Sequence, residues 1–129
     1  MILFLKILDY MNADENSFDM HAVNRLTIKE ELPKIPLSKN LPVVLMHHSP
    51  VGLEYVSRAG VDLMLSGHTH AGQIFPATLL TPFLFPLNKG LHRQDDTTFF
   101  VSQGAGTYGP RMRLGSANEI NLIRLRMKS

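Results

Sequence analysis

Residues 63–73 read Leu-Met-Leu-Ser-Gly-His-Thr-His-Ala-Gly-Gln, a short apolar run that leads into a polar loop flanked by glycines. The apolar run predicts a buried strand, and the glycines let the backbone turn sharply where the strand ends. His68 and His70 lie two positions apart in this loop, so both imidazoles can reach one point beyond the strand. Because imidazole is the commonest metal ligand in proteins, the stretch predicts a metal-binding turn. A polar turn with incidental histidines is the alternative.

A second apolar run ends in the same way. Residues 42–46 read Pro-Val-Val-Leu-Met, and His47 and His48 follow directly. Residues 51–60, between the two runs, have the length of a short helix, so we predict a β-α-β unit with parallel strands. Parallel strands bring their carboxyl ends to one edge of a sheet, where ligands bind in open α/β sheets. Four of the six histidines are therefore expected to meet at one rim.

Composition limits the classes of protein that the chain can represent. Its 129 residues suffice for one domain or part of one, and 44% hydrophobic content allows a buried core. A formal net charge of +2 is too small to indicate nucleic-acid binding, and none is expected. The absence of cysteine excludes a disulfide framework and a thiolate metal site.

The remaining pattern predicts an α/β fold. Residues 2–8 are too short to cross a bilayer, and a core strand directly after the initiator suggests that sequence is missing upstream. His21 lies inside a predicted helix, where we interpret it as a surface or packed residue rather than a ligand. The expected strands are 2–8, 42–46, 62–65, 98–102 and 118–125, and the expected helices are 18–31 and 51–59.

Residues 74–88 form an apolar stretch that three prolines interrupt. Proline opposes a regular helix or a central strand, so we predict a long loop. Long loops in compact domains are often functional, and this one would cover the site or offer a hydrophobic patch to a lipid or a partner. A packed surface loop is the alternative.

Several motifs together resemble the C-terminal half of the calcineurin-like metallophosphoesterases. The resemblance covers about residues 41–126 and is closest to a branch of bacterial, often membrane-associated phosphoesterases; we assign residues 1–129 to one partial domain of this type. The matching stretches are His48-Ser49-Pro50, Gly-His-Thr-His-Ala-Gly-Gln at 67–73, Gly-Leu-His-Arg at 90–93, Val-Ser-Gln-Gly-Ala-Gly-Thr at 101–107, Gly-Pro-Arg-Met-Arg-Leu-Gly at 109–115 and Glu119-Ile120.

The resemblance implies an α/β/β/α sandwich with mixed sheets flanked by helices, of which this chain holds about half. It implies two divalent metal ions in the complete domain, with His48 and His68 as ligands of one ion and His70 as a ligand of the other. An imidazole cluster without cysteine suits manganese, zinc, iron or nickel. Two such ions activate a water and neutralise phosphate oxygens during hydrolysis. The implied substrate is a phosphoester, including lipid or envelope-related ones.

The sequence departs from the family in its acidic motifs. The family's N-terminal half supplies carboxylate ligands and a histidine general acid from D-x-H, G-D and G-N-H-[DE] motifs. We find no G-D or G-N-H here, and we assign Asp9, Asp14 and Asp19 to none of these motifs. The isolated chain is therefore expected to be a weak or inactive enzyme. The alternative is a truncated, non-catalytic metal-binding fragment, or a half-domain that needs a partner chain. Any membrane association is expected through the missing N-terminal region.

Two arginines are candidates for contact with the substrate. Arg111 and Arg113 follow a glycine-rich turn at 104–110, and such a turn can bring backbone amides close to an anion. Guanidinium groups match the geometry of a phosphate. The alternative is an ordinary tight turn with two surface charges.

Overall fold

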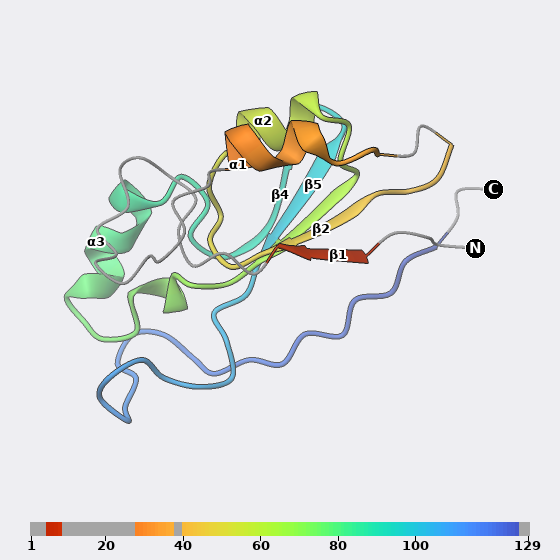
Figure 1. The fold of residues 1–129 in the computed structure, drawn as a ribbon. Coiled ribbons are helices and arrows are strands. Elements are labelled where there is room, and N and C mark those ends of the chain that lie inside the picture. The colour runs from red at the N-terminus through yellow and green to blue at the C-terminus, as the bar shows by residue number, and fades with distance from the viewer. Residues whose placement is uncertain (1–4, 9–27, 38–39, 127–129) are drawn as a thin grey trace.

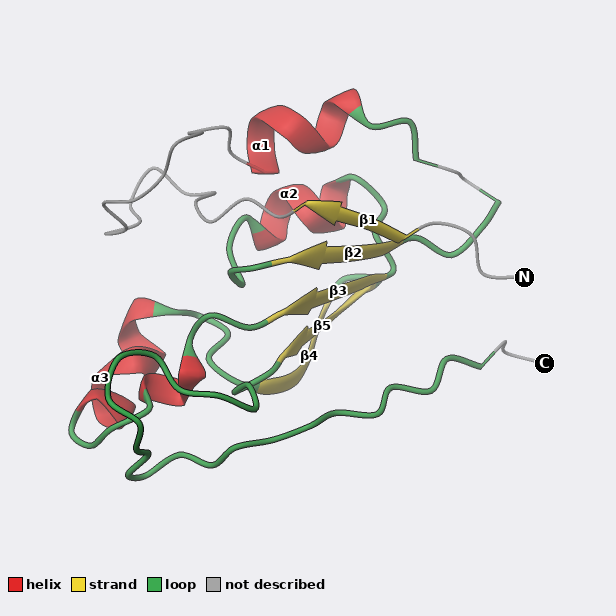
Figure 2. Ribbon diagram, turned by 60° about the horizontal axis from the view of Figure 1, so that its bottom comes forward, coloured by secondary structure: helices red, strands yellow, loops and turns green. Residues whose placement is uncertain are grey.

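The computed structural model describes residues 5–8, 28–37 and 40–126. Five strands form one sheet in the order β1-β2-β3-β5-β4, in which only the β4–β5 pair is antiparallel (Figures 1 and 2). The strands are β1 (Leu5–Leu8), β2 (Val44–His47), β3 (Leu63–Ser66), β4 (Gly90–Gln94) and β5 (Thr97–Val101).

Helices α1 and α2 cover one face of this sheet (Figure 1). The first helix continues into the 3-10 turn η1, and a second 3-10 turn, η2, carries His70. Helix α3 lies apart from the other two, beyond the carboxyl ends of the parallel strands (Figure 2). The bounds are α1 (Ile28–Glu31), η1 (Leu32–Lys34), α2 (Leu53–Arg58), η2 (His70–Gly72) and α3 (Ala77–Leu84).

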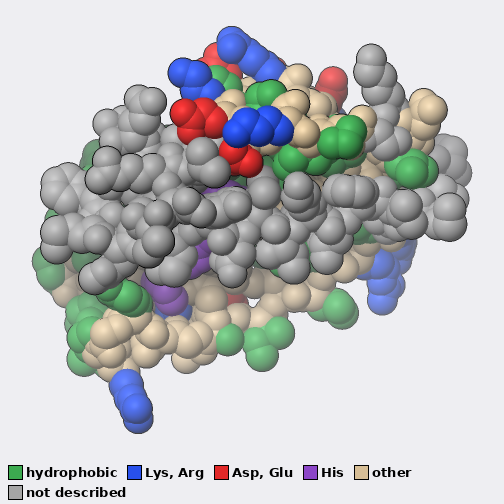
Figure 3. Space-filling model, in the orientation of Figure 1, with side chains coloured by type: hydrophobic (Ala, Val, Ile, Leu, Met, Phe, Trp, Pro, Cys, Tyr) green, Lys and Arg blue, Asp and Glu red, His purple; other side chains and the backbone are tan. Residues whose placement is uncertain are grey.

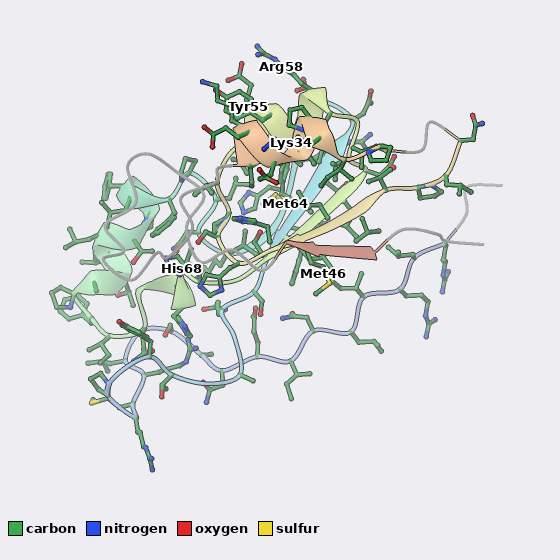
Figure 4. All side chains as sticks on the ribbon, in the orientation of Figure 1. Lys34, Met46, Tyr55, Arg58, Met64 and His68 are labelled. Atoms are coloured by element: carbon green, nitrogen blue, oxygen red, sulfur yellow. The ribbon has the colours of Figure 1, made fainter. Side chains whose placement is uncertain are left out.

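The core lies between the sheet and helices α1 and α2. Leu45, Met64 and Phe99 are register partners on three neighbouring strands, and each is at most 3% exposed. Side chains alternate between the two faces of a strand, so this row points toward the helices while Met46 points to the other face (Figure 4). Ile28 and Val56 cover the row from α1 and α2. Burying one such side chain stabilises the fold by about 1.5–3 kcal/mol.

The structure confirms the predicted α/β class and the β-α-β unit. Strands β2 and β3 are parallel and directly paired, and α2 lies between them in sequence. Predicted strand ends differ from the observed ones by one or two residues. Of the predicted strand 2–8 and helix 18–31, residues 2–4 and 18–27 lie outside the described residues.

The prediction of a strand at 118–125 is wrong. These residues join no ladder, and Ile120 and Leu122 are each 92% exposed. The segment after Gly115 instead runs back beside the sheet without entering it (Figure 2). Alternation indicates which face a strand would bury, but a strand also needs a paired strand for its backbone groups. Here the N–H of Glu119 donates to the carbonyl oxygen of Gly104 in a loop, and no described strand pairs with the segment.

The prediction of a long irregular loop at 74–88 is also wrong, because α3 forms within it. Pro76 is the N-cap residue, where no helical N–H is required, and Pro82 lies in the last half of the helix. Phe85 then leaves the helix before Pro86. Pro76 and Pro86 therefore flank a short helix, and Pro82 lies inside it.

Strand β4 was not predicted. It pairs with β5 around a two-residue turn at Asp95 and Asp96, and Asp95 has a φ of 52°. Aspartate in such a turn tolerates positive φ, so this Asp-Asp pair was the available hairpin signal.

Among the described residues, no helix is long and apolar enough to span a bilayer.

Gly72 is the residue through which η2 and α3 touch. A methyl group there would lie 2.6 Å from the carbonyl of Ala77, and its φ of +79° disfavours other residues. Gly60 has the same φ but open space around it.

We expect Gly60→Ala to lower the free energy of unfolding by about 1 kcal/mol, from backbone strain alone. Gly72→Ala should lower it by about 3 kcal/mol or more, since overpacking adds to that strain. Urea denaturation of both variants measures the difference. Equal losses would show that the η2–α3 contact is not close-packed.

Candidate metal site

Two of the predicted ligands meet at the carboxyl ends of β2 and β3. The Nε2 atom of His48 lies 2.9 Å from Nδ1 of His68, and the rings meet edge to face with centroids 4.7 Å apart. The N–H of Gly67 donates to the carbonyl oxygen of His48 at 3.0 Å, which joins the two strand ends. Figure 4 shows His68 between the end of the sheet and α3.

The loop that carries His68 and His70 has an unusual backbone. His68, His70, Ala71 and Gln73 all have φ between 47° and 68°. Non-glycine residues in this region are uncommon, and each costs about 1–3 kcal/mol. Such strain persists only where the surrounding structure imposes it, and it gathers at functional sites. The loop is therefore a candidate site on its geometry as well as on its histidines.

Side chains within the loop hold this backbone in place. The Thr69 hydroxyl donates to the carbonyl oxygen of Asn88 at 2.6 Å and accepts from the N–H of Ala71. The buried Gln73 amide donates to the carbonyl oxygens of Tyr108 and Pro110, and its Oε1 accepts from the N–H of Tyr108 at 2.6 Å. Gln73 thus ties the histidine loop to the glycine-rich turn.

Arg113 reaches the second histidine of the loop. One of its terminal nitrogens lies 3.1 Å from Nδ1 of His70, and the other lies 3.1 Å from the carbonyl oxygen of His70. A guanidinium group has five N–H donors, and here all of them have protein acceptors. The remaining acceptors are the hydroxyl of Ser116 and the carbonyl oxygens of Gln103, Gly104 and Gly106.

His47 turns away from the other histidines. It is 4% exposed, and its Nδ1 lies 2.7 Å from the carbonyl oxygen of Ser49. Its Nε2 is buried without a hydrogen-bond partner in the described structure. Adjacent side chains on a strand point to opposite faces, which explains why His48, and not His47, faces His68.

Two of these histidines are held in the neutral form. Burial lowers the pKa of His47 below its usual value and the charge of neighbouring His48 lowers it further, while the hydrogen bond from the His47 ring to the Ser49 carbonyl oxygen opposes this shift. Burial also lowers the pKa of His70, and the positive charges of Arg113 and His48 add to the effect. A metal binds only neutral imidazole, but the positive charge of Arg113 that lowers the pKa of His70 also repels a cation.

The contact between His48 and His68 is a hydrogen bond, so a hydrogen on one ring lies between the two facing nitrogens. Two nitrogens about 2.1 Å from one tetrahedral ion are about 3.4 Å apart. From the observed 2.9 Å, both nitrogens could reach one ion with a small movement once that hydrogen is lost. Within the described ranges, however, no three histidine, cysteine, aspartate or glutamate side chains gather closely enough to hold an ion.

His70 fits less well in this arrangement. An Arg113 N–H that donates to Nδ1 leaves the ring hydrogen of a neutral imidazole on Nε2. Neither nitrogen then presents a free lone pair to a metal. The predicted roles of His48, His68 and His70 as ligands remain predictions.

Sequence reasoning assigned different roles to the arginines and overlooked other residues. Arg113 donates to protein acceptors instead of lying open to a phosphate, whereas Arg111 is exposed. The sequence analysis gave Gln73 no role. Its side chain holds the histidine loop against the glycine-rich turn through Tyr108 and Pro110, and its place directly after the histidine turn was the available signal. Asp19-Met20-His21 was assigned to no motif but does have the D-x-H spacing; it lies outside the described residues.

Glu119 anchors the segment beside the sheet to the loop after β5. Its two carboxylate oxygens accept from the backbone and side-chain N–H groups of Gln103 at 2.7 and 3.1 Å. Asn121 donates to the same carboxylate at 3.1 Å. Desolvation raises the pKa of Glu119, but the hydrogen bonds from Gln103, Asn121 and Ser102 together lower it below the usual value.

Comparison with known proteins identifies the family. The chain is 43% identical over 89 residues to a Bos taurus transmembrane protein with a metallophosphoesterase domain, which covers 67% of the chain and 20% of that protein. It is 36% identical over 116 residues to a Helicobacter pylori (strain ATCC 700392 / 26695) protein named as a metallophosphoesterase, covering 87% of the chain and 31% of that protein. The chain belongs to the calcineurin-like metallophosphoesterase family.

Other relatives are consistent with this metallophosphoesterase assignment. Phosphodiesterase YaeI of Escherichia coli (strain K12) is 32% identical over 91 residues, which cover 67% of the chain and 33% of YaeI. No family model and no solved structure matches the chain. The chain spans only about a fifth to two fifths of the length of the curated relatives it matches.

Arg113 should stabilise the site without being replaceable by another cation. We expect Arg113→Ala to lower the free energy of unfolding by about 2 kcal/mol, because it leaves several carbonyl oxygens and His70 without their donor. Arg113→Lys should restore little of this loss, since one ammonium cannot reproduce the planar fork.

Arg111→Ala is the matched control and should change the free energy of unfolding by less than about 0.5 kcal/mol. Chemical denaturation of the three variants measures these values. Equal losses at positions 111 and 113 would contradict the bracing role of Arg113.

Glu119 should make stability depend on pH. Its folded-state pKa lies below the usual pKa of a glutamate side chain, so its carboxylate stabilises the fold fully above that usual pKa. This contribution is lost as pH falls through the lower folded-state pKa. Thermal melts of the original chain and of Glu119→Gln should therefore differ at neutral pH and converge in acid. A difference that is independent of pH would exclude the carboxylate as its cause.

Proposed function

We propose that this chain contributes half of the metal site of a phosphoester hydrolase. The observation that carries the proposal is the His48–His68 pair, whose facing nitrogens lie 2.9 Å apart at the carboxyl ends of two parallel strands. Family membership supports phosphoesterase chemistry.

In the proposal, His48 and His68 hold one divalent ion of a two-metal site and His70 serves the other. Manganese, zinc, iron and nickel all suit these donors. When bound, two such ions supply an activated water and neutralise the phosphate oxygens. The role of this chain is to fix the ligands: the strained loop orients His68, and Thr69 and Gln73 hold that loop.

His70 must first exchange its hydrogen bond if it is to ligate. Arg113 now donates to Nδ1 of His70, so binding through either nitrogen requires a shift of the ring hydrogen or of the arginine. A guanidinium released in this way would lie beside the site, where it can contact a phosphate. The predicted phosphate contacts of Arg113 and Arg111 belong to that loaded state.

The remaining ligands and the general acid are proposed to come from outside the described residues. Losing part of a cooperative catalytic unit removes most of its rate advantage, so the isolated chain should hydrolyse phosphoesters weakly or not at all. A half-domain completed by a partner chain is the alternative proposal. The name of the Escherichia coli relative favours a phosphodiester substrate.

Metal binding by the isolated chain tests the site directly. We expect His48→Ala to bind Zn²⁺ or Mn²⁺ at least about tenfold more weakly than the original chain. Calorimetric titration measures this affinity. His68→Asn should lose as much, and it retains a residue that tolerates the left-handed backbone. His92→Ala is the control, since His92 bonds only the Lys89 carbonyl oxygen in the described structure.

Equal metal affinity in all three variants would exclude the His48–His68 pair as the site. Hydrolysis of bis-p-nitrophenyl phosphate provides the second readout. Robust metal-dependent turnover by these 129 residues as a monomer would contradict the half-site proposal.

A further inference from the structure

His47 is a buried histidine without a role in the proposed metal site. It is the last residue of β2 and directly precedes His48. Side chains alternate between the two faces of a strand, so His47 lies on the same face as Leu45, which packs in the core against α1 and α2. Its ring therefore points away from His68, and any effect of His47 on the site passes through the backbone.

One ring nitrogen of His47 bonds to the backbone two residues further on. Its Nδ1 lies 2.7 Å from the carbonyl oxygen of Ser49. A carbonyl oxygen only accepts hydrogen bonds, so at this distance the ring hydrogen lies on Nδ1. The backbone nitrogen of Ser49 lies farther from Nδ1, at 3.3 Å. The bond between the ring and the carbonyl group thus encloses the whole backbone of His48.

The other ring nitrogen of His47 is left without a partner. With the hydrogen on Nδ1, Nε2 presents only a lone pair, and this atom is buried without a hydrogen bond in the described structure. Charged side chains gather on the outer side of α1 and α2 (Figure 3), whereas the layer between these helices and the sheet is apolar. An unpaired polar atom in such a layer is unfavourable and calls for an explanation. An aliphatic side chain would avoid it, so the bond from Nδ1 is the feature that a histidine adds here.

The carbonyl oxygen of Ser49 is a junction between the ends of β2 and β3. Besides the hydrogen bond from the His47 ring, it accepts from the N–H of Val51 at 2.9 Å and from the hydroxyl of Ser66 at 3.4 Å. Ser66 is the last residue of β3. Ser49 is 7% exposed, so water has little access to this oxygen and the three donors determine its position.

The preceding carbonyl group is held by the next residue of the other strand end. The N–H of Gly67 donates to the carbonyl oxygen of His48 at 3.0 Å. Residues 48 and 49 are thus bonded to residues 67 and 66, and His68 follows directly. The backbone segments that carry the two facing imidazoles are therefore joined directly beside the 2.9 Å contact between the rings.

We propose that His47 is a positioning residue for the histidine pair. By holding the Ser49 carbonyl group, it fixes the backbone of His48 and directs Nε2 of His48 toward Nδ1 of His68. The consequence for metal binding rests on the proposed function, whereas the arrangement of the pair in the metal-free chain does not. If His47 only fills space in the core, any side chain that leaves the fold intact would serve as well.

Two substitutions of similar polarity separate these roles. The amide nitrogen of His47→Asn is as many bonds from the backbone as Nδ1, so it can donate to Ser49, and the unpaired Nε2 is gone. The amide of His47→Gln lies one bond further out, at the position of Nε2, and loses the Ser49 bond. If His47→Gln does not fold, His47→Leu repeats the test without either nitrogen. Val56→Ala is the control for lost packing, because Val56 is 0% exposed in the same core but lies on α2.

Nitrogen-15 NMR of the metal-free chain measures the pair directly. A hydrogen bond between two ring nitrogens gives a scalar coupling between them, here between Nε2 of His48 and Nδ1 of His68. We expect this coupling in the original chain, in His47→Asn and in Val56→Ala, and we expect His47→Gln to lose it while remaining folded. A coupling that persists in His47→Gln, that is lost equally in both His47 variants, or that is absent from the original chain would overturn the proposal.

Zinc titration is the second readout, and it separates this proposal from the proposed function. His47→Gln should bind Zn²⁺ at least about tenfold more weakly than the original chain, while His47→Asn and Val56→Ala should keep most of the affinity. Equal zinc affinity of the original chain and of His48→Ala would contradict the proposed metal site, and the nitrogen coupling would then still decide the role of His47. Equal losses in His47→Asn and His47→Gln would identify a general loss of packing and overturn the positioning role.

Discussion

The left-handed backbone of the histidine loop is the constraint on which the site depends. Four non-glycine residues between positions 68 and 73 adopt positive φ, a conformation that survives only when neighbours over-determine it. Thr69 and Gln73 supply that restraint within the loop, and Arg113 supplies it from a distant segment. The positive φ of His68 accompanies a side chain that faces His48, with the two ring nitrogens 2.9 Å apart.

Much of the scaffold was predictable because it rests on local patterns. Apolar runs at 42–46 and 62–65, separated by a helix-length segment, suffice for a right-handed crossover between parallel strands. That topology alone brings His48 and His68 to one edge, and strand alternation separates His47 from them. The family resemblance, carried by the same motifs, agrees with the relatives found by comparison.

The features that the sequence did not predict correctly depend on contacts between distant segments, which no local pattern encodes. The alternation at 118–125 predicted a strand, but in the described structure this segment contacts the loop after β5 and pairs with no strand. Prolines in 74–88 suggested a loop, yet their positions at the cap and in the last half of α3 allow a helix. From the sequence alone, Arg113 could be an ordinary surface charge. In the fold, carbonyl oxygens of the glycine-rich turn surround its guanidinium group.

We propose that the facing nitrogens of His48 and His68 form a metal-binding pair. The most direct measurement is nitrogen-15 NMR of the histidine side chains during titration with Zn²⁺. We expect the resonances of Nε2 of His48 and Nδ1 of His68 to shift together at the first equivalent of Zn²⁺, while those of His92 stay unchanged. Unchanged resonances of His48 and His68, with zinc bound elsewhere or not at all, would contradict it.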